Sequence, residues 1–266
     1  APVYVCLDAA LQDARLEQEI VVPAVNDYAP PSLPQADPSA LAKAAELLVH
    51  AERPIVITDY SGRNQQSVAS LVKLAELLAL PVIDFGSRGN FPNDHSLDLT
   101  DDSVELAREA DVVLALDMGD LESALTVLDS TSRKIVNLTP EDAKVIHITL
   151  GDLSLKSWCQ HIGKLRAVHV PILADTSLAL PSLIELCLQM ITSGKKERYG
   201  QRFVALKARH DSSRQKWLEK AKGTGGEKPI AAPHLAIELW EHIKDEDWVL
   251  VGTPHTMFTW TRRLWN

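Results

Sequence analysis

Apolar runs of strand length alternate with amphipathic stretches through the middle of the chain. The runs are rich in valine, isoleucine and leucine, and they cover Arg53–Thr58, Leu80–Asp84, Asp111–Leu116, Lys134–Asn137, Lys144–Ile148 and Val168–Leu173. The stretches beside them repeat apolar residues at helical spacing, in Leu41–His50, Ser67–Leu78, Val104–Glu109, Gly119–Leu128 and Ser177–Ile191. Nearly continuous apolar strands that alternate with helices are typical of a parallel sheet covered on both faces. The pattern therefore predicts an α/β fold with a doubly wound, Rossmann-like parallel sheet.

Both ends of the sequence carry the pattern of a further strand. Ala1–Asp8 is rich in β-branched and aromatic residues, and Trp248–Val251 is another apolar run. The second run leads through a short turn into a helix, in which the sequence stops. Because the chain opens on a core strand and stops early in a helix, we expect it to be a piece of a longer protein.

Two segments divide the chain into candidate domains. Pro23–Pro38 is rich in proline, which excludes the interior of a sheet or helix and indicates an extended linker. Lys195–Lys222 has the pattern of a charged helix, and Gly223–Pro229 reads as a flexible joint. We therefore predict the end of one domain and a linker in residues 1–36, a central domain in residues 37–222, and the start of a further α/β domain in residues 223–266.

Composition limits the partners of the protein. The formal net charge of −9 offers no basic surface for nucleic acid and disfavours anionic membranes. No apolar run reaches the ~20 residues of a membrane-spanning helix. The cysteines, Cys6, Cys159 and Cys187, are widely spaced, which indicates buried free thiols in a reducing compartment. We expect a cytoplasmic enzyme or enzyme domain that acts on a small molecule.

The sequence lacks the short motifs of several enzyme classes. Its histidines show neither HxH nor HExxH spacing, which argues against a zinc site. No G-x-S-x-G elbow, P-loop or early G-x-G-x-x-G occurs, so hydrolases, NTPases and nicotinamide-dependent oxidoreductases lack their motif. We assign no catalytic residue and no metal ligand within the chain.

One turn near the end of the sequence is the main candidate for a binding site. It comprises Thr253, Pro254, His255, Thr256 and Met257. The turn lies between an apolar run and a helix, so free backbone N–H groups collect there. The Thr256 hydroxyl and the His255 ring add donors, and the set suits an anion such as a diphosphate. The alternative is a surface turn that caps the helix.

Several segments are similar, in the same order, to motifs of one enzyme family. The pairs are Ala1–Asp8 with "GPVYV-x-L-P-x-D", Glu52–Ile57 with "A-x-R-P-V-I", Leu80–Asp84 and Arg88–His95 with "lPV-x-t-x-x-x-x-rG-x-x-p-x-dHp", Ala110–Leu116 with "aDlvl-x-lG", and Asp245–Trp260 with "vvt-x-x-G-x-H-q-x-w". Along almost its whole length, the chain thus resembles the thiamine-diphosphate enzymes of the acetolactate synthase, benzoylformate decarboxylase and benzaldehyde lyase group.

The resemblance implies a subunit of three α/β domains: pyrimidine-binding, central and diphosphate-binding. It implies cleavage or formation of a C–C bond in 2-oxo acids or related carbonyl compounds, with thiamine diphosphate and Mg²⁺ in the complete protein. It also implies a homodimer or homotetramer. The turn Thr253–Met257 would contact the cofactor diphosphate.

The resemblance further implies that decisive parts lie outside this sequence. The glutamate that activates the cofactor would precede Ala1, and the "GDG…N" motif that holds Mg²⁺ would follow Asn266, so we expect the fragment alone to be inactive. The competing hypothesis is a non-catalytic nucleotide-binding or dimerisation module with a Rossmann-like fold.

Turns of the central domain bear on flavin binding. Asp59–Arg63 stands where some relatives carry a glycine-rich turn against a flavin, and Asp117–Asp120 replaces a segment that acetolactate synthases use beside FAD. The carboxylates of both turns would repel a diphosphate, so the sequence disfavours FAD. Arg88 is a candidate partner for an anionic ligand, although a bridge to Asp94 or to a neighbouring domain is the interpretation we favour.

Overall fold

The computed structural model describes residues 4–15, 18–86, 89–151, 165–226, 228–251 and 256–265, with the backbone alone at Thr256 and Met257. The chain divides into two compact units, Ala1–Ser32 and Leu33–Asn266. Each unit is considered by itself below.

The first unit contains short helical segments in otherwise extended chain. Helix α1 (Ala9–Asp13) begins at Asp8, whose carboxylate accepts a hydrogen bond from the Ala10 N–H, and a 3-10 turn, η1, covers Val25–Tyr28. Residues 4–8 form no strand, and the Tyr4 side chain is 92% exposed. The prediction of a buried strand is therefore wrong for these residues, because a strand needs a neighbour and no described residue pairs with them.

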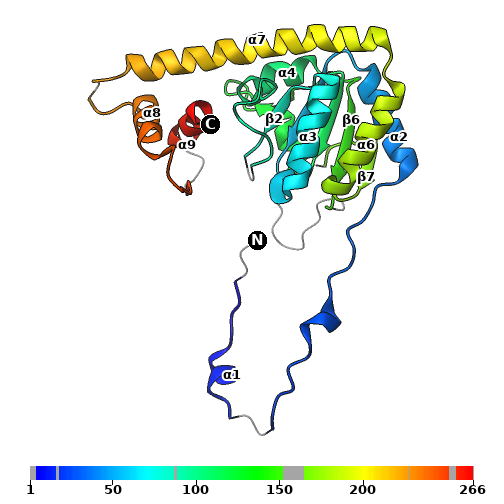
Figure 1. The fold of residues 1–266 in the computed structure, drawn as a ribbon, viewed down its shortest axis with the longest axis vertical. Helices are drawn as coiled ribbons and strands as arrows, with labels where there is room; N and C mark the ends of the chain where they lie inside the picture. Colours follow the sequence, from blue (N-terminus) through cyan, green and yellow to red (C-terminus); the bar gives the residue numbers. More distant parts are fainter. Residues whose placement is uncertain are drawn as a thin grey trace. The chain divides into compact units, whose positions relative to one another are not determined.

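The second unit is built on a parallel sheet covered by helices (Figure 1). The sheet has five strands in the order β2-β1-β3-β6-β7. The strands are β1 (Pro54–Thr58), β2 (Val82–Asp84), β3 (Val112–Leu116), β6 (Lys144–Thr149) and β7 (Val170–Leu173). This order confirms the predicted doubly wound α/β fold. The direction in which strands are added reverses between β1 and β3, and ligands of such sheets collect at the carboxyl ends of the strands at this switch point.

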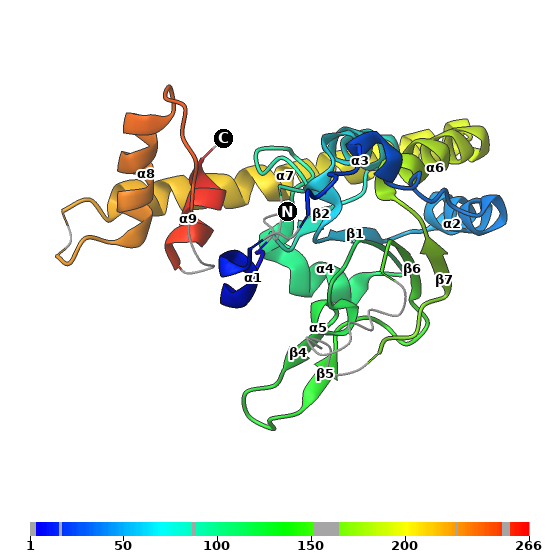
Figure 2. The same cartoon turned by 90° about the horizontal axis from the view of Figure 1, so that it is seen from below.

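Helices cover both faces of the sheet (Figure 2). One face carries α2 (Pro38–His50), α3 (Gln65–Leu78) and α6 (Thr176–Met190). The other carries α4 (Ser103–Glu109), preceded by the 3-10 turn η3 (Thr100–Asp102), and α5 (Leu121–Ala124), followed by the hairpin strands β4 (Thr126–Leu128) and β5 (Ile135–Asn137). Successive residues of β1 are therefore buried on opposite faces, which explains its continuous apolar run.

The hairpin corrects two sequence predictions. The helix expected over Gly119–Leu128 ends at Ala124, because Leu125 is buried in the core and the next residues pair with β5 instead of continuing the helix. The strand expected over Lys134–Asn137 exists, but it pairs antiparallel with β4 and lies outside the central sheet.

The chain then forms α7 (Ser193–Gly223), α8 (Ala232–Ile243) and α9 (Thr256–Leu264). The end of α7 packs with α8 and α9 around Ala221, Trp260 and Trp265. The described residues Trp248–Val251 form no strand and Val249 is 84% exposed, so the predicted buried strand is wrong here, since no described strand lies beside it to pair with.

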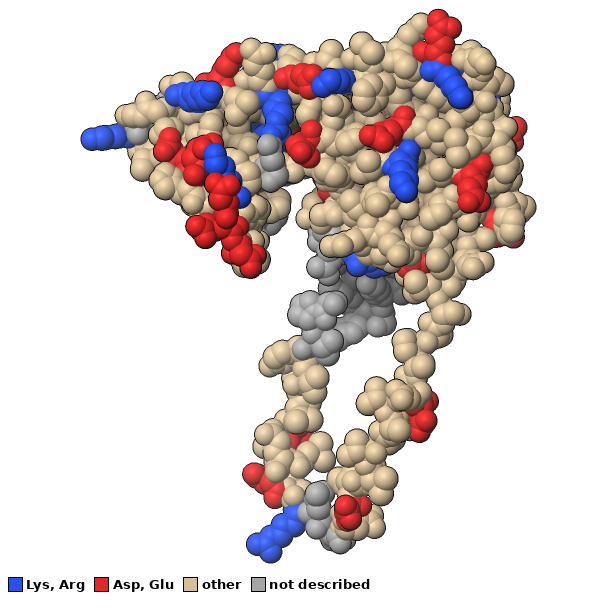
Figure 3. Space-filling model, viewed as in Figure 1, with Lys and Arg blue, Asp and Glu red and all other residues tan. Residues whose placement is uncertain are grey.

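Two properties of the described surface and helices bear on partners. Acidic and basic side chains are interspersed over most of the face drawn in Figure 3, and acidic side chains gather at its lower left. Among the described helices, none combines the length and the apolar character that crossing a membrane requires.

Candidate functional site

The turn after β1 is packed tightly at the switch point. It contains the 3-10 turn η2 (Ser61–Arg63), and Gly62 donates its N–H to the Asn90 Oδ1 at 2.8 Å. A Cβ added at Gly62 would lie 2.3 Å from the carbonyl oxygen of Gly89. Only glycine therefore allows the turn after β1 to lie this close to the loop after β2.

Arg63 bridges two carboxylates at this edge of the sheet. Its guanidinium lies 2.8 Å from Asp117, at the end of β3, and 3.0 Å from Asp175, the N-cap residue of α6. Asp117 also accepts a hydrogen bond from the Thr176 hydroxyl at 2.8 Å. Because both carboxylates are buried, they depend on Arg63 for a compensating charge.

The pKa of Asp175 shows whether burial or hydrogen bonding has the larger effect on this carboxyl group. Burial by itself would raise the pKa of this carboxyl, but hydrogen bonds from Ser177 and Arg63 outweigh it and hold the pKa below its ordinary value. The pKa of Arg63 is raised, because the two carboxylates outweigh the cost of burying the guanidinium.

Asp59 adds a further carboxylate beside Gly119. Its Oδ2 accepts the Gly119 N–H at 3.3 Å, while Oδ1 is buried without a hydrogen-bond partner among the described residues. The structure thus brings together the two turns that the sequence singled out, Asp59–Arg63 and Asp117–Asp120. The resulting cluster holds more carboxylates than cations, an arrangement unsuited to a phosphate group.

Asp84 organises the adjoining loop at the end of β2. Its carboxylate accepts hydrogen bonds from the Gly86 N–H at 2.7 Å and from the Asn90 side-chain amide at 2.7 Å. Burial raises the pKa of Asp84, although these hydrogen bonds oppose the rise. The candidate Arg88 lies outside the described residues, so its pairing with Asp94 stays a prediction.

The predicted anion-binding turn leads directly into α9. Thr253, Pro254 and His255 lie outside the described residues, whereas Thr256 and Met257 form the beginning of the helix, with their backbone alone described. The first turn of α9 contains no acidic residue, and its basic residues lie in the last turn. An anion at the N-terminus of α9 would therefore meet helix N–H groups and no opposing carboxylate from that turn.

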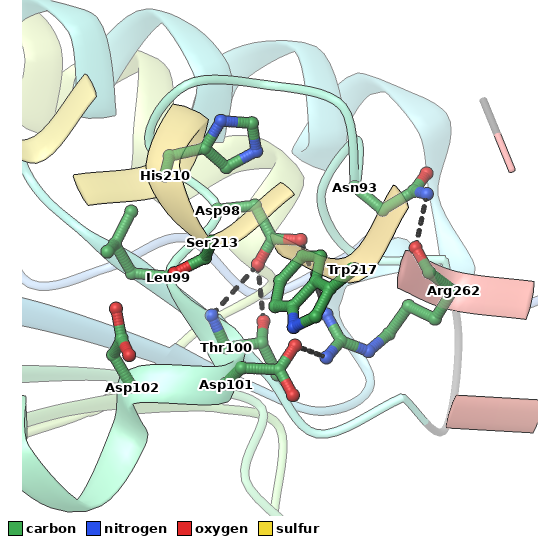
Figure 4. A pocket seen from close by; sticks show the side chains of 10 residues that line it. All are labelled: Asn93, Asp98, Leu99, Thr100, Asp101, Asp102, His210, Ser213, Trp217 and Arg262. Carbon is green, nitrogen blue, oxygen red and sulfur yellow. Dashed lines mark hydrogen bonds and ion pairs between the residues drawn. The ribbon is translucent and has the colours of Figure 1, made fainter. Parts of the chain in front are cut away.

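Helix α9 is tied to the central sheet by an ionic network that the sequence analysis missed (Figure 4). Arg262 pairs with Asp98 at 3.4 Å and with Asp101, and the Arg263 Nε donates to Asp101 at 3.0 Å. Asn93 donates to the carbonyl oxygens of Arg262 and Trp265. The signal available in the sequence was the Arg262-Arg263 pair together with the acidic run 98–102.

The cavity drawn in Figure 4 is a packed contact. Its volume is about 10 Å³, and its lining includes Asp98, His210 and Trp217. Such a volume accommodates about one water molecule. Burial raises the pKa of Asp98, an effect that the nearby Arg262 opposes. These residues therefore connect α7, α9 and the loop after β2.

A larger cavity of about 340 Å³ lies between the end of β2 and α9. Aromatic rings make up much of its lining: Phe91, Trp248, Phe258 and Trp265. Asp84 and Arg262 supply polar groups. The cavity adjoins the beginning of α9, and it belongs to the same edge of the sheet as the switch-point turns.

The remaining candidate chemistry is limited. Burial raises the pKa of the Cys187 thiol to about 12, so this cysteine stays protonated and is a poor nucleophile. Within the described ranges, no group of three or more histidine, cysteine, aspartate or glutamate side chains has the arrangement of a metal site.

The sequence profile of the thiamine pyrophosphate enzyme central domain matches residues 41–183. These residues run from α2 into α6 and include every strand of the parallel sheet. The chain therefore belongs to the thiamine pyrophosphate enzyme family, which confirms the resemblance noted from the motifs.

Curated relatives agree with this family. The probable acetolactate synthase large subunit of Methanocaldococcus jannaschii is 25% identical over 276 residues, which cover 99% of this chain and 42% of that protein. A glyoxylate carboligase of Escherichia coli O157:H7 is 27% identical over 197 residues, which cover 73% of this chain and 31% of that protein. The chain thus spans less than half the length of the curated relatives it matches.

Among solved structures, benzoylformate decarboxylase from Polynucleobacter necessarius is similar to this chain. The TM-score is 0.45 at 18% sequence identity, with 65% of this chain and 30% of that chain covered.

Proposed function

We propose that the chain is part of a thiamine-diphosphate-dependent enzyme that cleaves or forms C–C bonds in 2-oxo acids or related carbonyl compounds. The observation that carries the proposal is the family match over residues 41–183, which spans the complete parallel sheet. The names of the relatives, an acetolactate synthase and a glyoxylate carboligase, support carbonyl chemistry. The same match disfavours the competing hypothesis of a non-catalytic module.

The proposed cofactor contacts are Thr253, Pro254, His255, Thr256 and Met257. The donor set fits a diphosphate, because threonine hydroxyls, a histidine ring and helix N–H groups all donate hydrogen bonds. The absence of an acidic residue from the first turn of α9 supports this assignment. When bound, thiamine diphosphate supplies the ylid that adds to a carbonyl carbon and the electron sink for the carbanion.

This chain's own contribution is anchorage and orientation. In the proposal, Thr256 and His255 donate to phosphate oxygens, and the N-terminus of α9 holds the negative charge. The ionic contacts of Arg262 and Arg263 with Asp98 and Asp101 fix α9 against the central sheet. Neighbouring parts of the complete protein would supply the catalytic groups and the Mg²⁺ ligands.

We further propose that the central domain holds no FAD. Asp117 and Asp175 pair with a single guanidinium, that of Arg63, at the switch point, and Asp59 adds a carboxylate beside Gly119. A flavin diphosphate there would have to displace Arg63 or approach these carboxylates, and both are unfavourable.

The division of the chain into residues 1–36, 37–222 and 223–266 is proposed on the basis of the family's three-domain order. A homodimer or homotetramer and a cytoplasmic location are likewise proposals. The first rests on the family, and the second rests on the wide spacing of the cysteines.

The test is an assay of the full-length protein as the cell makes it. CO₂ release from a panel of 2-oxo acids is measured with and without thiamine diphosphate and Mg²⁺, alongside cleavage of acyloins and acyl-CoA compounds. Cofactor-dependent turnover of any of these substrates supports the proposal and separates decarboxylase from lyase chemistry. No thiamine diphosphate binding and no turnover would refute it.

The assignment of the turn is tested separately. We expect Thr256→Val and His255→Ala to raise the Kd for thiamine diphosphate about tenfold, because a hydrogen bond to a charged phosphate contributes about 1.5–3 kcal/mol. Thr131→Val, in the exposed β4–β5 hairpin, serves as the matched control and leaves the Kd unchanged. Equal affinities in all three variants would exclude the turn as the diphosphate site.

A further inference from the structure

A groove runs between α7 and the amino-terminal edge of the parallel sheet. Its volume is about 440 Å³, within the range of ~300–1,000 Å³ that is usual for small-molecule sites. Arg53, Arg198, Arg202 and Arg209 all contribute to its lining. In Figure 1, α7 crosses the edge of the sheet at which α3 ends, opposite the turns that follow the strands.

Arg198 and Arg202, both on α7, contact the carbonyl ends of helices. Arg202 donates to the carbonyl oxygens of Ala51 at 3.3 Å, of Glu52 at 3.0 Å, and of Leu78. Arg198 donates to the carbonyl oxygen of Val49 at 3.2 Å. Carbonyls at a helix C-terminus carry a partial negative charge of about half a unit, so they only partly offset two full positive charges.

Neither Arg198 nor Arg202 has a carboxylate at ion-pair distance within the part of the chain that the structure describes. Arg209 differs, because it pairs with Asp102 at 2.5 Å. The four arginines of the lining face two acidic residues, Glu52 and Glu109, both of which are exposed. The neighbourhood of Arg198 and Arg202 therefore has an excess of positive charge.

The titration of Arg202 agrees with this excess. Burial and the neighbouring Arg198 lower the pKa of Arg202 to about 10, against a weaker opposing effect of Tyr199 and Asp111. A nearby positive charge that lowers the pKa of a guanidinium raises the affinity for an anion at the same place.

The arginines also retain hydrogen-bonding capacity. A guanidinium has five N–H donors, and the described bonds of Arg198 to carbonyl oxygens use one of them. The Nε atoms of Arg198 and Arg202 are buried and have no hydrogen-bond partner among the described residues. The terminal N–H groups of Arg198 that its bond to Val49 leaves over are suitable donors to a phosphate or carboxylate group in the groove, whereas the buried Nε atoms are not exposed to a ligand.

The rest of the lining is apolar. Pro54, Ile55, Pro81, Leu106 and Leu206 border the groove. A ligand that fits both parts carries an anionic group at one end and a ring or short hydrocarbon body at the other.

We propose that this groove is a binding site for a small organic anion, with a phosphate or carboxylate group on Arg198 and Arg202 and an apolar body on the prolines and leucines. The site is independent of the proposed cofactor turn. It requires only the contacts of α7 with α2, α3 and the beginning of β1.

The test measures binding of phenyl phosphate, benzoate and inorganic phosphate to the full-length protein by calorimetry. Saturating thiamine diphosphate and Mg²⁺ are present, so that the proposed diphosphate turn is filled. We expect phenyl phosphate or benzoate to bind at least about fivefold more tightly than inorganic phosphate, because only they contact the apolar lining. The tighter of the two identifies the anionic group.

Charge variants locate the site. Gln201 lines the groove from an exposed position on α7, so Gln201→Glu should weaken binding about fivefold and Gln201→Lys should strengthen it by a similar factor. Gln215→Glu places the same charge on an exposed position of the same helix outside the groove, and it should change binding less than twofold. Circular dichroism confirms that each variant is folded.

Arg198→Gln tests the role of Arg198 in binding the anion directly. It removes one guanidinium and should weaken binding about tenfold. The absence of binding for all three probes overturns the proposal. Equal effects of Gln201→Glu and Gln215→Glu, or wild-type affinity in a folded Arg198→Gln variant, also overturn it.

Discussion

Arg63 lies 2.8 Å from Asp117 and so joins the turn after β1 to the end of β3. The same guanidinium reaches Asp175 at 3.0 Å and thereby includes the beginning of α6. One side chain thus connects three segments that are remote in sequence, at the edge where ligands of parallel sheets collect. In this protein, Arg63, Asp117 and Asp175 occupy that edge of the sheet with ion pairs among themselves.

Replacement of Arg63 by glutamine is expected to destabilise the protein. Asp117 and Asp175 would stay buried without a compensating charge, which costs about 2–4 kcal/mol of unfolding free energy after allowance for the partial exposure of Arg63. Arg63→Lys keeps the positive charge but lacks the forked guanidinium, so it should lower the unfolding free energy by less than Arg63→Gln does. Urea denaturation at neutral pH measures both. Wild-type stability of Arg63→Gln would show that the two carboxylates do not depend on this pair.

Gly62→Ala is expected to lower the unfolding free energy by about 2–4 kcal/mol, because its Cβ would overlap the backbone carbonyl of Gly89. Gly200→Ala is the matched control: it lies inside α7, and apart from its chain neighbours and the adjacent helix backbone no atom lies within 4 Å of its added Cβ. Higher helix propensity should stabilise that variant by up to ~1 kcal/mol. If the turn is packed as described, thermal denaturation will show a lower Tm for Gly62→Ala and a higher Tm for Gly200→Ala than for the wild type.

His147 should make stability fall between about pH 6.5 and pH 4. It lies in β6 between Ala115 and Pro171, its Nε2 has no partner among the described residues, and burial lowers its pKa from 6.5 to about 4. Within this interval the unfolded chain binds the proton and the folded chain does not, so acid favours unfolding. The contribution is about 3 kcal/mol, present in full above pH 6.5 and lost as the pH falls towards 4.

The comparison of wild type with His147→Gln isolates this contribution. Other groups titrate nearby: His169 has a lowered pKa and acts in the same direction, whereas Asp84 and Asp98 have raised pKa values and act in the opposite one. These groups are present in both proteins and cancel in the difference. Parallel curves of unfolding free energy against pH for the two proteins would contradict the prediction.

Asp101→Asn should loosen α9 from the central sheet. Asp101 accepts hydrogen bonds from both Arg262 and Arg263, and these contacts outweigh burial and keep its pKa below the ordinary value. We expect a loss of about 1–3 kcal/mol in unfolding free energy and faster hydrogen exchange of the α9 amides.

Glu241→Gln is the control for this network, because Glu241 pairs with Lys244 at the exposed surface of α8. Such pairs contribute about 0–1 kcal/mol. A similar effect of Asp101→Asn and Glu241→Gln on exchange in α9 would mean that the network does not hold the helix.

The fold class was largely predictable from local patterns. Strands buried on both faces must be apolar at nearly every position, and Pro54–Thr58 and Val112–Leu116 satisfy that requirement in the sequence itself. The start of α2 also depends on residues close together in the sequence. Asp37 accepts a hydrogen bond from the Ala40 N–H, and Pro38 occupies the first turn.

Local patterns gave wrong predictions where the secondary structure depends on pairing with a segment distant in the sequence. Tyr4 and Val249 belong to runs with strand character, but strands form only through pairing, and no described strand lies beside either run. Thr126 continued a helical pattern, yet its pairing with Asn137 directs the chain into a hairpin.

By itself, the sequence determined the strands of the parallel sheet, the helices α2, α3 and α6 beside it, the class of fold and the family, because burial and helix capping act through residues close together in the chain. Only the tertiary structure decided that Arg63 would meet Asp117 and Asp175, and that Arg262 would meet Asp101. The order of the strands brings Arg63 to its partners, and the packing of α9 brings Arg262 to Asp101. No local propensity encodes contacts between residues so far apart in the sequence.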